Sequence, residues 1–382
     1  MEPFDAVMSG NISRRRMLAG LGAIGAVSTL GACSRVDEGS AAPAPSLTGS
    51  AESETGQLAA YEWAGYDDAS MYSAYIEAGN KKPKFSFLTS TDAAIAKTAT
   101  GYQWDVTHPS SSYIQDYLDI DALRPWDTSL IPNFESLNPS LSAAGQVDGQ
   151  QYGIVLDWGY QAPLIRTDKV DPDLDSYAYL FSDEAAGHIS WFDSPWLLQE
   201  AAISQGMNPG DSFSMTQAEL DDISDFVIDV GRRNVYNVWV NYQDMWDDVQ
   251  KGNVWVTDAW PDAYVALKDK APVKYVRPSG GTLAWTGAMV LRDDTANPFH
   301  AHEFVDAWAS VATANYLIGV YGYGHSNTDV NLNKIDPEVA AAFGLDDPAK
   351  NLAEPLTYVE RYNPNRKAYA RAWADVKAAM GA

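Results

Sequence analysis

Residues 187–205 read GHISWFDSPWLLQEAAISQ, and this stretch indicates how the chain folds. Its first part, residues 187–192, is a short apolar run typical of a buried strand, whereas residues 195–205 have the apolar spacing of a helix. Between them, a polar capping residue precedes a proline at the first helical position. A strand, a turn and a helix in immediate succession predict one unit of an α/β fold.

The same alternation continues on both sides of this unit. Residues 297–298, Asn-Pro, open a later helix with the same kind of start signal. Further strands are expected at residues 58–63, 84–88, 104–107, 152–156, 254–259, 273–276 and 285–291, and further helices at residues 70–78, 216–230, 242–252, 262–268 and 298–310 with a continuation through 318. This order predicts α/β lobes with mostly parallel sheets. With no internal repeat and no second linker, the two lobes are expected to share the chain by crossing back and forth.

The composition narrows the classes of protein that the chain can belong to. Its 382 residues are 46% hydrophobic and 20% charged, which excludes disorder throughout. With 26 Lys and Arg against 51 Asp and Glu, the formal charge is −25, so no nucleic-acid partner is expected. One cysteine cannot form an internal disulfide or a multi-cysteine metal cluster. The 13 Trp, 21 Tyr and 11 Phe supply burial, and aromatic faces in an acidic protein also suit a cationic ligand.

The first 33 residues indicate targeting. Three arginines precede an apolar run at residues 17–32 that is too short to span a bilayer. Residues 13–18 (SRRRML) resemble a twin-arginine export signal, and residues 30–33 (LGAC) resemble a lipoprotein box. We therefore expect a lipidated Cys33, with a buried free thiol in an anchor helix as the alternative, and a flexible tether over residues 34–57. The mature protein would then be anchored outside the cytoplasm, in the periplasmic space or on the outer cell surface.

Catalytic signatures are absent from the sequence. It contains no phosphate-binding glycine loop, no zinc-protease His-Glu pair and no serine in a nucleophile elbow. His300 and His302 point apart on a helix, so they cannot share a metal ion. Asp171, Asp173 and Asp175 begin like a calcium loop, but the later glycine and glutamate of such a loop are missing. No catalytic residue, metal or cofactor is predicted.

Four tryptophans stand at the ends of expected strands, next to small or turn residues: Trp63, Trp158, Trp260 and Trp285. Ligands bind at strand ends in α/β lobes, so these rings are candidates for a binding site, although each could instead fill a core. Tryptophan platforms also serve sugar binding, and carboxylate pairs serve glycosidases. A secreted carbohydrate-binding or carbohydrate-active lipoprotein therefore remains the alternative function.

Several segments resemble the spermidine/putrescine-type (polyamine) substrate-binding proteins of ABC transporters. They follow in order and at similar spacing over most of the mature body: residues 61–66 (YEWAGY), 104–111 (WDVTHPSS), 124–127 (RPWD) with 138–139 (NP), 152–154 (YGI) with 158–159 (WG), 192–193 (FD), Trp260, 280–285 (GGTLAW) and 322–327 (GYGHSN). No single segment is specific for this family, but eight segments in register behind a lipoprotein signal are specific for it.

The resemblance implies a two-lobed periplasmic-binding-protein fold of type II, with an interlobe ligand cleft and a hinge. Lobe 1 would comprise residues 58–162 and 288–325, and lobe 2 residues 163–287 and 326–382. Such a protein is not an enzyme. It would act as a monomer that captures a polyamine or other small organic cation and delivers it to separate permease and ATPase subunits. A sensing role beside a membrane receptor is a further alternative that the sequence leaves open.

The resemblance also implies the ligand contacts, which are Trp63, Tyr66, Trp260 and Trp285 as ring walls, Ser111 and Tyr113 as polar contacts with another ring, and Asp193 as the carboxylate that receives an amine. At Ala64, Trp196 and Gly287 the chain departs from the family pattern, and the last two replace acids. Fewer acids and more rings favour a ligand with one positive centre, such as a quaternary amine, a monoamine or a zwitterion. Because Asp157, Asp258 and Asp262 lie beside cleft tryptophans, a linear polyamine remains possible.

Overall fold

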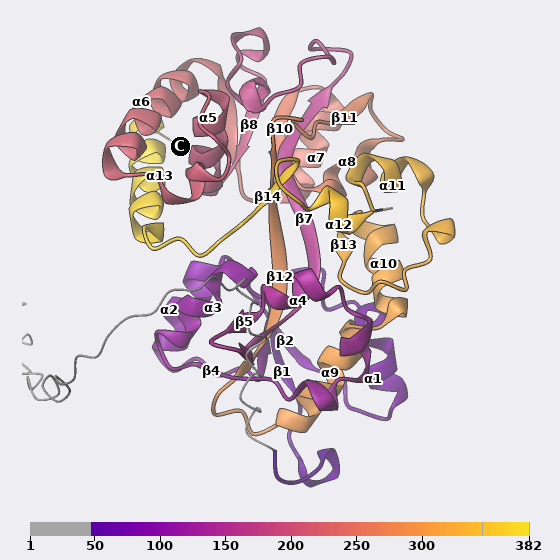
Figure 1. Ribbon diagram of the computed structural model, residues 1–382. Helices are drawn as coiled ribbons and strands as arrows, with labels where there is room; N and C mark the ends of the chain where they lie inside the picture. The colour runs from indigo at the N-terminus through magenta and orange to yellow at the C-terminus, as the bar shows by residue number, and fades with distance from the viewer. Residues whose placement is uncertain (1–46, 346, 382) are drawn as a thin grey trace, which may run out of the picture. The chain divides into compact units, whose positions relative to one another are not determined.

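Two long strands organise the computed structural model, which describes residues 47–345 and 347–381. The predicted signal, Cys33 and most of the expected tether lie outside the described residues. Strands β7 (Gly153–Arg166) and β12 (Thr282–Arg292) run side by side and antiparallel through the middle of the main sheet (Figure 1). The main sheet has the strand order β2-β1-β3-β12-β7-β10-β8-β9. The other strands are β1 (Ala59–Glu62), β2 (Lys84–Phe87), β3 (Val106–Thr107), β4 (Leu123–Arg124), β5 (Gln146–Val147), β6 (Gln150–Gln151), β8 (Ile189–Phe192), β9 (Val235–Trp239), β10 (Val256–Ala259), β11 (Val273–Tyr275), β13 (Gly324–His325) and β14 (Thr357–Val359).

The pairing directions differ between the lobes and the strands that join them. In lobe 1, β1 pairs parallel with β2 and β3; in lobe 2, β8 pairs parallel with β9 and β10. The joining strands β7 and β12 pair antiparallel with each other, with β10 and with β3. The sheet is therefore mixed, and the prediction of mostly parallel sheets is wrong for β7 and β12. One strand crosses from lobe 1 to lobe 2 and the other returns, so the two must run in opposite directions.

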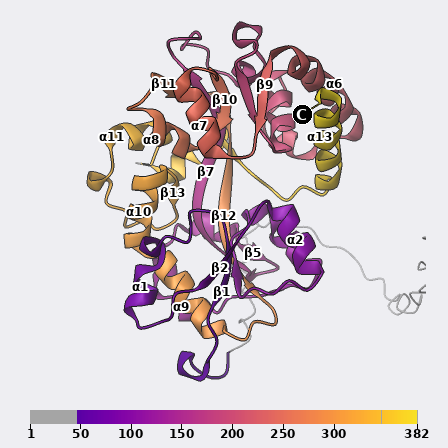
Figure 2. The ribbon, with the colours of Figure 1, turned by 180° about the vertical axis from the view of Figure 1, so that it is seen from behind.

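Helices cover both faces of the sheet, as Figure 2 shows from behind. Helix α13 packs on α6 beside α5, and α10 contacts both α8 and β13. The α-helices are α1 (Ser73–Glu77), α2 (Thr91–Ala99), α3 (Ile114–Leu118), α4 (Pro139–Ala143), α5 (Trp196–Ser204), α6 (Gln217–Asn234), α7 (Tyr242–Lys251), α8 (Pro261–Leu267), α9 (Pro298–Trp308), α10 (Val311–Tyr321), α11 (Pro337–Phe343), α12 (Pro348–Asn351) and α13 (Arg366–Met380). Short 3-10 helices are η1 (Ala51–Ser53), η2 (Ala69–Tyr72), η3 (Ser111–Tyr113), η4 (Thr128–Leu130), η5 (Pro132–Ser136), η6 (Tyr177–Phe181), η7 (Asp183–Ala185), η8 (Asp211–Ser214) and η9 (Leu332–Lys334).

The start of α5 differs from the expectation in one respect that matters for the site. The helix begins at Trp196, whose N–H donates to Ser194 Oγ at 3.3 Å. Asp193 makes no capping bond, and its carboxylate points elsewhere. In α6, by contrast, Thr216 and Glu219 form a complete capping box, which explains why this helix start was visible in the sequence.

Strand β7 extends ten residues beyond the end of the predicted strand at residue 156, and all of its residues are buried. The sequence obscures this length because Asp157, Gly159 and Pro163 interrupt the apolar run. Gly159 is required by packing, since a Cβ atom there would stand 2.5 Å from Trp285 Cζ2. The Trp285 ring on the neighbouring strand β12 therefore packs directly on the backbone of β7 at position 159.

Two of the predicted boundaries between the lobes, at residues 162/163 and 287/288, fall inside strands β7 and β12. The second boundary coincides with a β-bulge between Gly287 and Ala288. The body begins earlier than residue 58. Glu54 caps α9 through the N–H groups of Phe299 (2.7 Å) and His300 (2.9 Å), so residues from η1 onward are attached to lobe 1. A carboxylate at a helix N-terminus satisfies amides that lack a partner in the helix, which explains the attachment.

Candidate functional site

An aromatic group lies at one edge of the lobe 2 sheet. The neighbouring parallel strands β9, β8 and β10 end at Trp239, at Phe192 and just before Trp260. The Phe192 ring centroid lies 4.5 Å from that of Trp239 and 4.9 Å from that of Trp260. Phe192 and Trp260 are partly exposed, whereas Trp239 is buried. These three residues form the lobe 2 platform, at the strand ends where α/β sheets bind ligands.

A second aromatic group connects lobe 1 with the joining strands. The Tyr66 ring contacts Tyr321 (5.9 Å between centroids), Tyr321 stacks on Tyr323 (5.5 Å), and Tyr323 meets Trp285 edge-on (5.0 Å). We call these four residues the central ring cluster. Trp63 lies beside it, with its indole N–H donating to the carbonyl of His108 at 2.7 Å.

The structure brings the four predicted ring residues to one apolar cluster. Trp63, Trp260 and Trp285 are partly exposed, and all three pack against a buried cluster that contains Tyr66 and Tyr323. Trp158, the fourth strand-end tryptophan, is fully buried and belongs to the other core cluster. Three further aromatic residues, Trp239, Tyr321 and Tyr323, were not predicted as site residues. Residues 322–324 do belong to one of the motifs that resemble the polyamine-binding family.

A buried acid network, made of Glu62, His108 and Asp157, adjoins the central ring cluster. His108 lies between the two carboxylates, with Nδ1 3.1 Å from Glu62 Oε1 and Nε2 3.1 Å from Asp157 Oδ1. Tyr66 donates its hydroxyl proton to the other Asp157 oxygen. Burial alone would lower the pKa of His108, but the two carboxylates outweigh burial and raise it to about 10. The network therefore holds an imidazolium at neutral pH.

The same network shifts the two acids in opposite directions. Burial raises the pKa of Glu62, and the nearby His108 charge only partly opposes the shift. Burial also opposes ionisation of Asp157, but the His108 charge and the bonds from His108 and Tyr66 bring its pKa below the usual range. Asp157 is thus the more acidic of the pair, and its carboxylate accepts the hydroxyl of Tyr66 in the central ring cluster.

A second buried acid, Asp262, lies on the lobe 2 side. Its carboxylate accepts the N–H of Ala263 at 2.9 Å. Burial raises the pKa of Asp262 to about 7, opposed by that hydrogen bond. Of Asp157 and Asp262, it is Asp157 that accepts a phenol of the central ring cluster.

Asp193, expected to be free to receive an amine, is already paired. Its Oδ1 lies 2.6 Å from Lys377 Nζ and its Oδ2 lies 2.8 Å from the same atom. The indole N–H of Trp373 donates to Oδ1 at 2.7 Å. Both partners come from α13, about 180 residues further along the chain, which is why no local sequence signal pointed to them.

Ser111 and Tyr113, the two predicted contacts in η3, lie in different environments. Ser111 is buried, and its hydroxyl lies 2.5 Å from Thr286 Oγ1, next to Trp285. Tyr113 lies under the guanidinium of Arg366, whose Cζ is 3.2 Å from the ring centroid. Ser111 thus adjoins the central ring cluster, whereas the ring of Tyr113 is covered.

A groove of about 490 Å³ opens beside this loop. Ser111, Ser112, Glu360 and Tyr362 help to line it. Glu360 accepts the hydroxyl of Ser110 at 2.6 Å, and burial raises its pKa, with the charge of Arg366 opposing the shift. Glu360 is a polar group of the site region that the sequence analysis missed.

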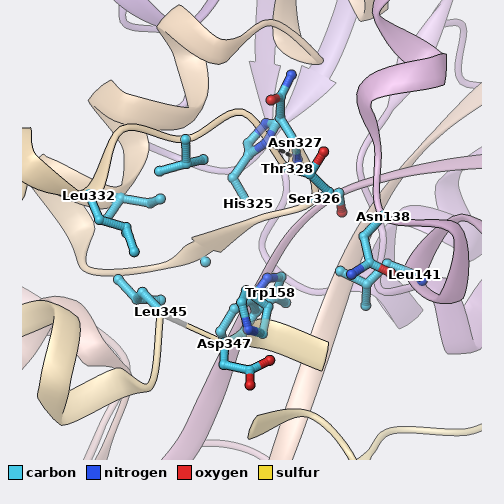
Figure 3. Close-up of a pocket in the computed structure, with 14 residues that line it drawn as sticks. Asn138, Leu141, Trp158, His325, Ser326, Asn327, Thr328, Leu332, Leu345 and Asp347 are labelled. Atoms are coloured by element: carbon cyan, nitrogen blue, oxygen red, sulfur yellow. Dashed lines mark hydrogen bonds between the residues drawn. The ribbon is translucent and has the colours of Figure 1, made fainter. Parts of the chain in front are cut away.

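A separate cavity of about 210 Å³ lies beside β7 and β13 (Figure 3). Its lining includes Trp158, Ser326 and Leu345 and none of the seven predicted site residues. Within the described part of the chain, Trp158 Nε1 and Ser326 Oγ have no hydrogen-bond partner. Across residues 47–345 and 347–381, no group of His, Cys, Asp and Glu side chains is arranged to hold a metal ion, and no helix is long and apolar enough to cross a membrane.

Two of the three departures from the polyamine pattern have a visible structural setting. At position 287 a Cβ atom would stand 2.0 Å from Asp157 Oδ1, so a side chain has no room beside the acid network. Trp196 is partly exposed and packs against the core of lobe 2 at the start of α5. Ala64 is exposed, and nothing in the structure explains its difference from the family pattern.

Known structures share this architecture. A spermidine/putrescine ABC transporter substrate-binding protein from Streptococcus pneumoniae, in complex with calcium and HEPES, has a TM-score of 0.67 at 20% identity and covers 85% of this chain and 99% of its own. A periplasmic binding protein from A. tumefaciens B6 in complex with glucopine has a TM-score of 0.69 at 14% identity, covering 84% and 100%. The fold is the two-lobed type II fold of periplasmic binding proteins, as the resemblance predicted.

The sequence comparison identifies the family. The family model described as bacterial extracellular solute-binding protein matches residues 86–376, and the chain belongs to this family. The spermidine/putrescine-binding periplasmic protein 1 of Haemophilus influenzae is 24% identical over 325 residues, which cover 81% of this chain and 88% of the relative. The predicted resemblance to spermidine/putrescine-binding proteins is confirmed by these relatives, and the carbohydrate alternative is not favoured.

Proposed function

We propose that this protein binds a small organic cation or amine between its two lobes and delivers it to an ABC permease. Trp63, Tyr66, Trp285 and the lobe 2 platform around Trp260 would form the ring walls, with Ser111 as a polar contact. Closure would be a hinge motion about β7 and β12, stabilised by a ligand that touches both lobes. The protein itself would perform no bond chemistry.

The observation that carries this proposal is a phenol of the central ring cluster that is bonded to a buried acid. Tyr66 donates to Asp157, whose carboxylate also pairs with His108. A phenol that donates to a carboxylate gains electron density on its ring, which strengthens the attraction of the ring face for a cation. The formal charge of −25 would add a long-range attraction for cations without adding specificity.

The cellular setting is part of the same proposal. Export by the twin-arginine signal, lipidation at Cys33, a tether and a monomeric anchored receptor would hold the binding lobes near the membrane. The permease and ATPase would be separate chains. The membership in an extracellular solute-binding family supports this setting, and mass spectrometry of the membrane fraction for an acylated Cys33 tests it.

A thermal-shift titration tests the proposed ligand class. The purified protein is heated with putrescine, spermidine, tetramethylammonium, 4-aminobutyrate or glucose over a range of concentrations. Stabilisation by a bound ligand grows with its concentration relative to Kd, reaching about 2.7 kcal/mol at one hundred times Kd. We expect at least one amine to raise Tm and glucose to have no effect. A response to glucose with none to any amine would overturn the proposal.

A further inference from the structure

Lys377 occupies a complete ammonium site at the edge of the lobe 2 sheet. Its Nζ lies 2.6 and 2.8 Å from the two oxygens of Asp193 and 5.9 Å from the centroid of the Trp373 ring. A carboxylate and an indole face are the two groups that an amine ligand would seek. The Asp193 carboxylate and the Trp373 ring thus form the kind of site that binds an amine, and the ammonium group of Lys377 occupies it.

This ion pair lies at the site rather than in the core. Asp193 directly follows Phe192 of the lobe 2 platform, at the end of β8. The side chains of Lys377 and Asp193 are 29% and 26% exposed, so both meet solvent at the end of β8 that carries Phe192. Lys377 and Trp373 are four residues apart on α13, which packs on α6, so the helix holds the ammonium in place.

The other carboxylates of the ring region are already bonded. Asp157 accepts from Tyr66 and pairs with His108, and Asp262 accepts the N–H of Ala263. Both acids are buried. Of Asp157, Asp262 and Asp193, Asp193 is the partly exposed one, and Lys377 occupies it.

We propose that Lys377 determines specificity by taking the place of a second ligand ammonium, so that the protein selects ligands with one cationic centre over linear diamines. This inference rests on the proposed function and names its substrate class. A diamine would have to displace an ammonium that is tethered beside Asp193 at a high effective concentration. It would also leave Lys377 unpaired or bring two ammonium groups together.

Three ligands of one carbon skeleton test the inference by calorimetry. Putrescine, 1-aminobutane and 4-aminobutyrate share a four-carbon chain and one amine, and differ only at the far end, which is an ammonium, a methyl or a carboxylate. We expect the wild-type protein to bind 1-aminobutane or 4-aminobutyrate more tightly than putrescine.

The variant Lys377→Met should reverse this order. Methionine keeps the unbranched stem and a good helix propensity, so α13 should remain folded. A charge-assisted hydrogen bond to the released Asp193 should raise the affinity for putrescine about tenfold or more, with less than about threefold change for 1-aminobutane. The double variant Asp193→Asn, Lys377→Met should lose the gain in affinity for putrescine, because the neutral amide of asparagine cannot form an ion pair with an ammonium.

Lys268→Met is the matched control. Lys268, which directly follows α8, forms a comparable ion pair with Asp336 at 2.9 Å, its side chain is 16% exposed, and it belongs to neither aromatic group. Its removal should leave all three affinities unchanged.

The outcomes separate this inference from the proposed function. Wild-type protein that prefers putrescine over 1-aminobutane, with no further gain in Lys377→Met, would overturn the role of Lys377 and leave the proposed function standing. The inference also fails if the gain persists in the double variant. Failure of both proteins to bind any of the three amines would overturn this inference, and the thermal-shift titration with the wider set of cations then decides the proposed function.

Discussion

Gly287 lies directly opposite Asp157 on the paired strands β12 and β7. A Cβ atom on Gly287 would stand 2.0 Å from Asp157 Oδ1 and 2.8 Å from His108 Nε2. The acid network and a side chain at position 287 therefore exclude each other. The chain lacks an acid at 287 and instead carries one across the strand pair, where its carboxylate accepts the hydroxyl of Tyr66.

The variant Gly287→Ala should be destabilised. The added methyl group overpacks the contact between β12 and the acid network, which typically costs about 1–3 kcal/mol in the free energy of unfolding. Urea denaturation measures the change. Gly280→Ala is the control, since a Cβ there meets nothing within 4 Å, and its stability should change by less than about 1 kcal/mol. Equal effects of the two substitutions would show that position 287 is not crowded.

His108 should stabilise the protein most strongly at low and neutral pH. Its pKa is about 10 in the folded protein and 6.5 without the fold, so its contribution is complete below pH 6.5 and is lost as the pH rises toward 10. The stability advantage of the wild type over His108→Gln should shrink over this range, by up to about 1.4 kcal/mol per pH unit. Urea titrations of both proteins at pH 6, 8 and 9.5 provide the comparison. A constant difference would mean that His108 is not held as an imidazolium.

Glu200 should show the same trend with pH, beginning at lower pH. It is fully buried, and neither carboxylate oxygen has a partner among the described residues. Burial and the nearby Asp258 raise its pKa well above 4.5, so the folded protein keeps a proton that the unfolded chain releases. Stability from this group is present below about pH 4.5 and falls as the pH rises.

The free energy of unfolding of Glu200→Gln, relative to wild type, should therefore increase between pH 5 and pH 8. Glu135→Gln, at an exposed carboxylate, should show no such trend. If the two variants follow the same pH dependence, Glu200 is not protonated in the fold.

Trp285 should contribute to amine binding through its ring. Trp285→Ala is expected to weaken binding of the best amine about 2- to 30-fold, the range of cation–π energies at partly exposed and desolvated sites. Trp255→Ala is the control, because that ring stacks on His188 with centroids 3.7 Å apart, outside both aromatic groups. Calorimetry on both variants decides the matter. Unchanged affinity in Trp285→Ala would remove this residue from the proposed ring wall.

The elements that the sequence revealed are those with local signals. Helices α6 and α7 directly follow Thr216 and Asn241, whose side chains cap them, and Gly252, in the left-handed conformation, caps the C-terminal end of α7. Strand β9 and helix α13 were missed, although each is well formed. β9 is an edge strand of mostly partly exposed residues, and α13 starts without a side-chain cap, so neither stood out locally.

The candidate site was predictable in part for the same reason. Strand ends are recognisable from sequence, so Trp63, Trp260 and Trp285 could be selected before their neighbours were known. The state of Asp193 could not be predicted, because it depends on Lys377 of α13. A resemblance that identifies a carboxylate says nothing about which cation will already be bonded to it.

The sequence by itself determined the class of protein: its alternating strands and helices indicated α/β lobes, and its motifs resembled those of two-lobed solute-binding proteins, without the structure. The tertiary structure alone decided which acids are free. Glu62, His108 and Asp157 come from three strands or their ends, and Asp193 meets Lys377 across about 180 residues of chain. Charge pairing acts over a few ångströms of space regardless of separation along the chain, and only folding sets those distances.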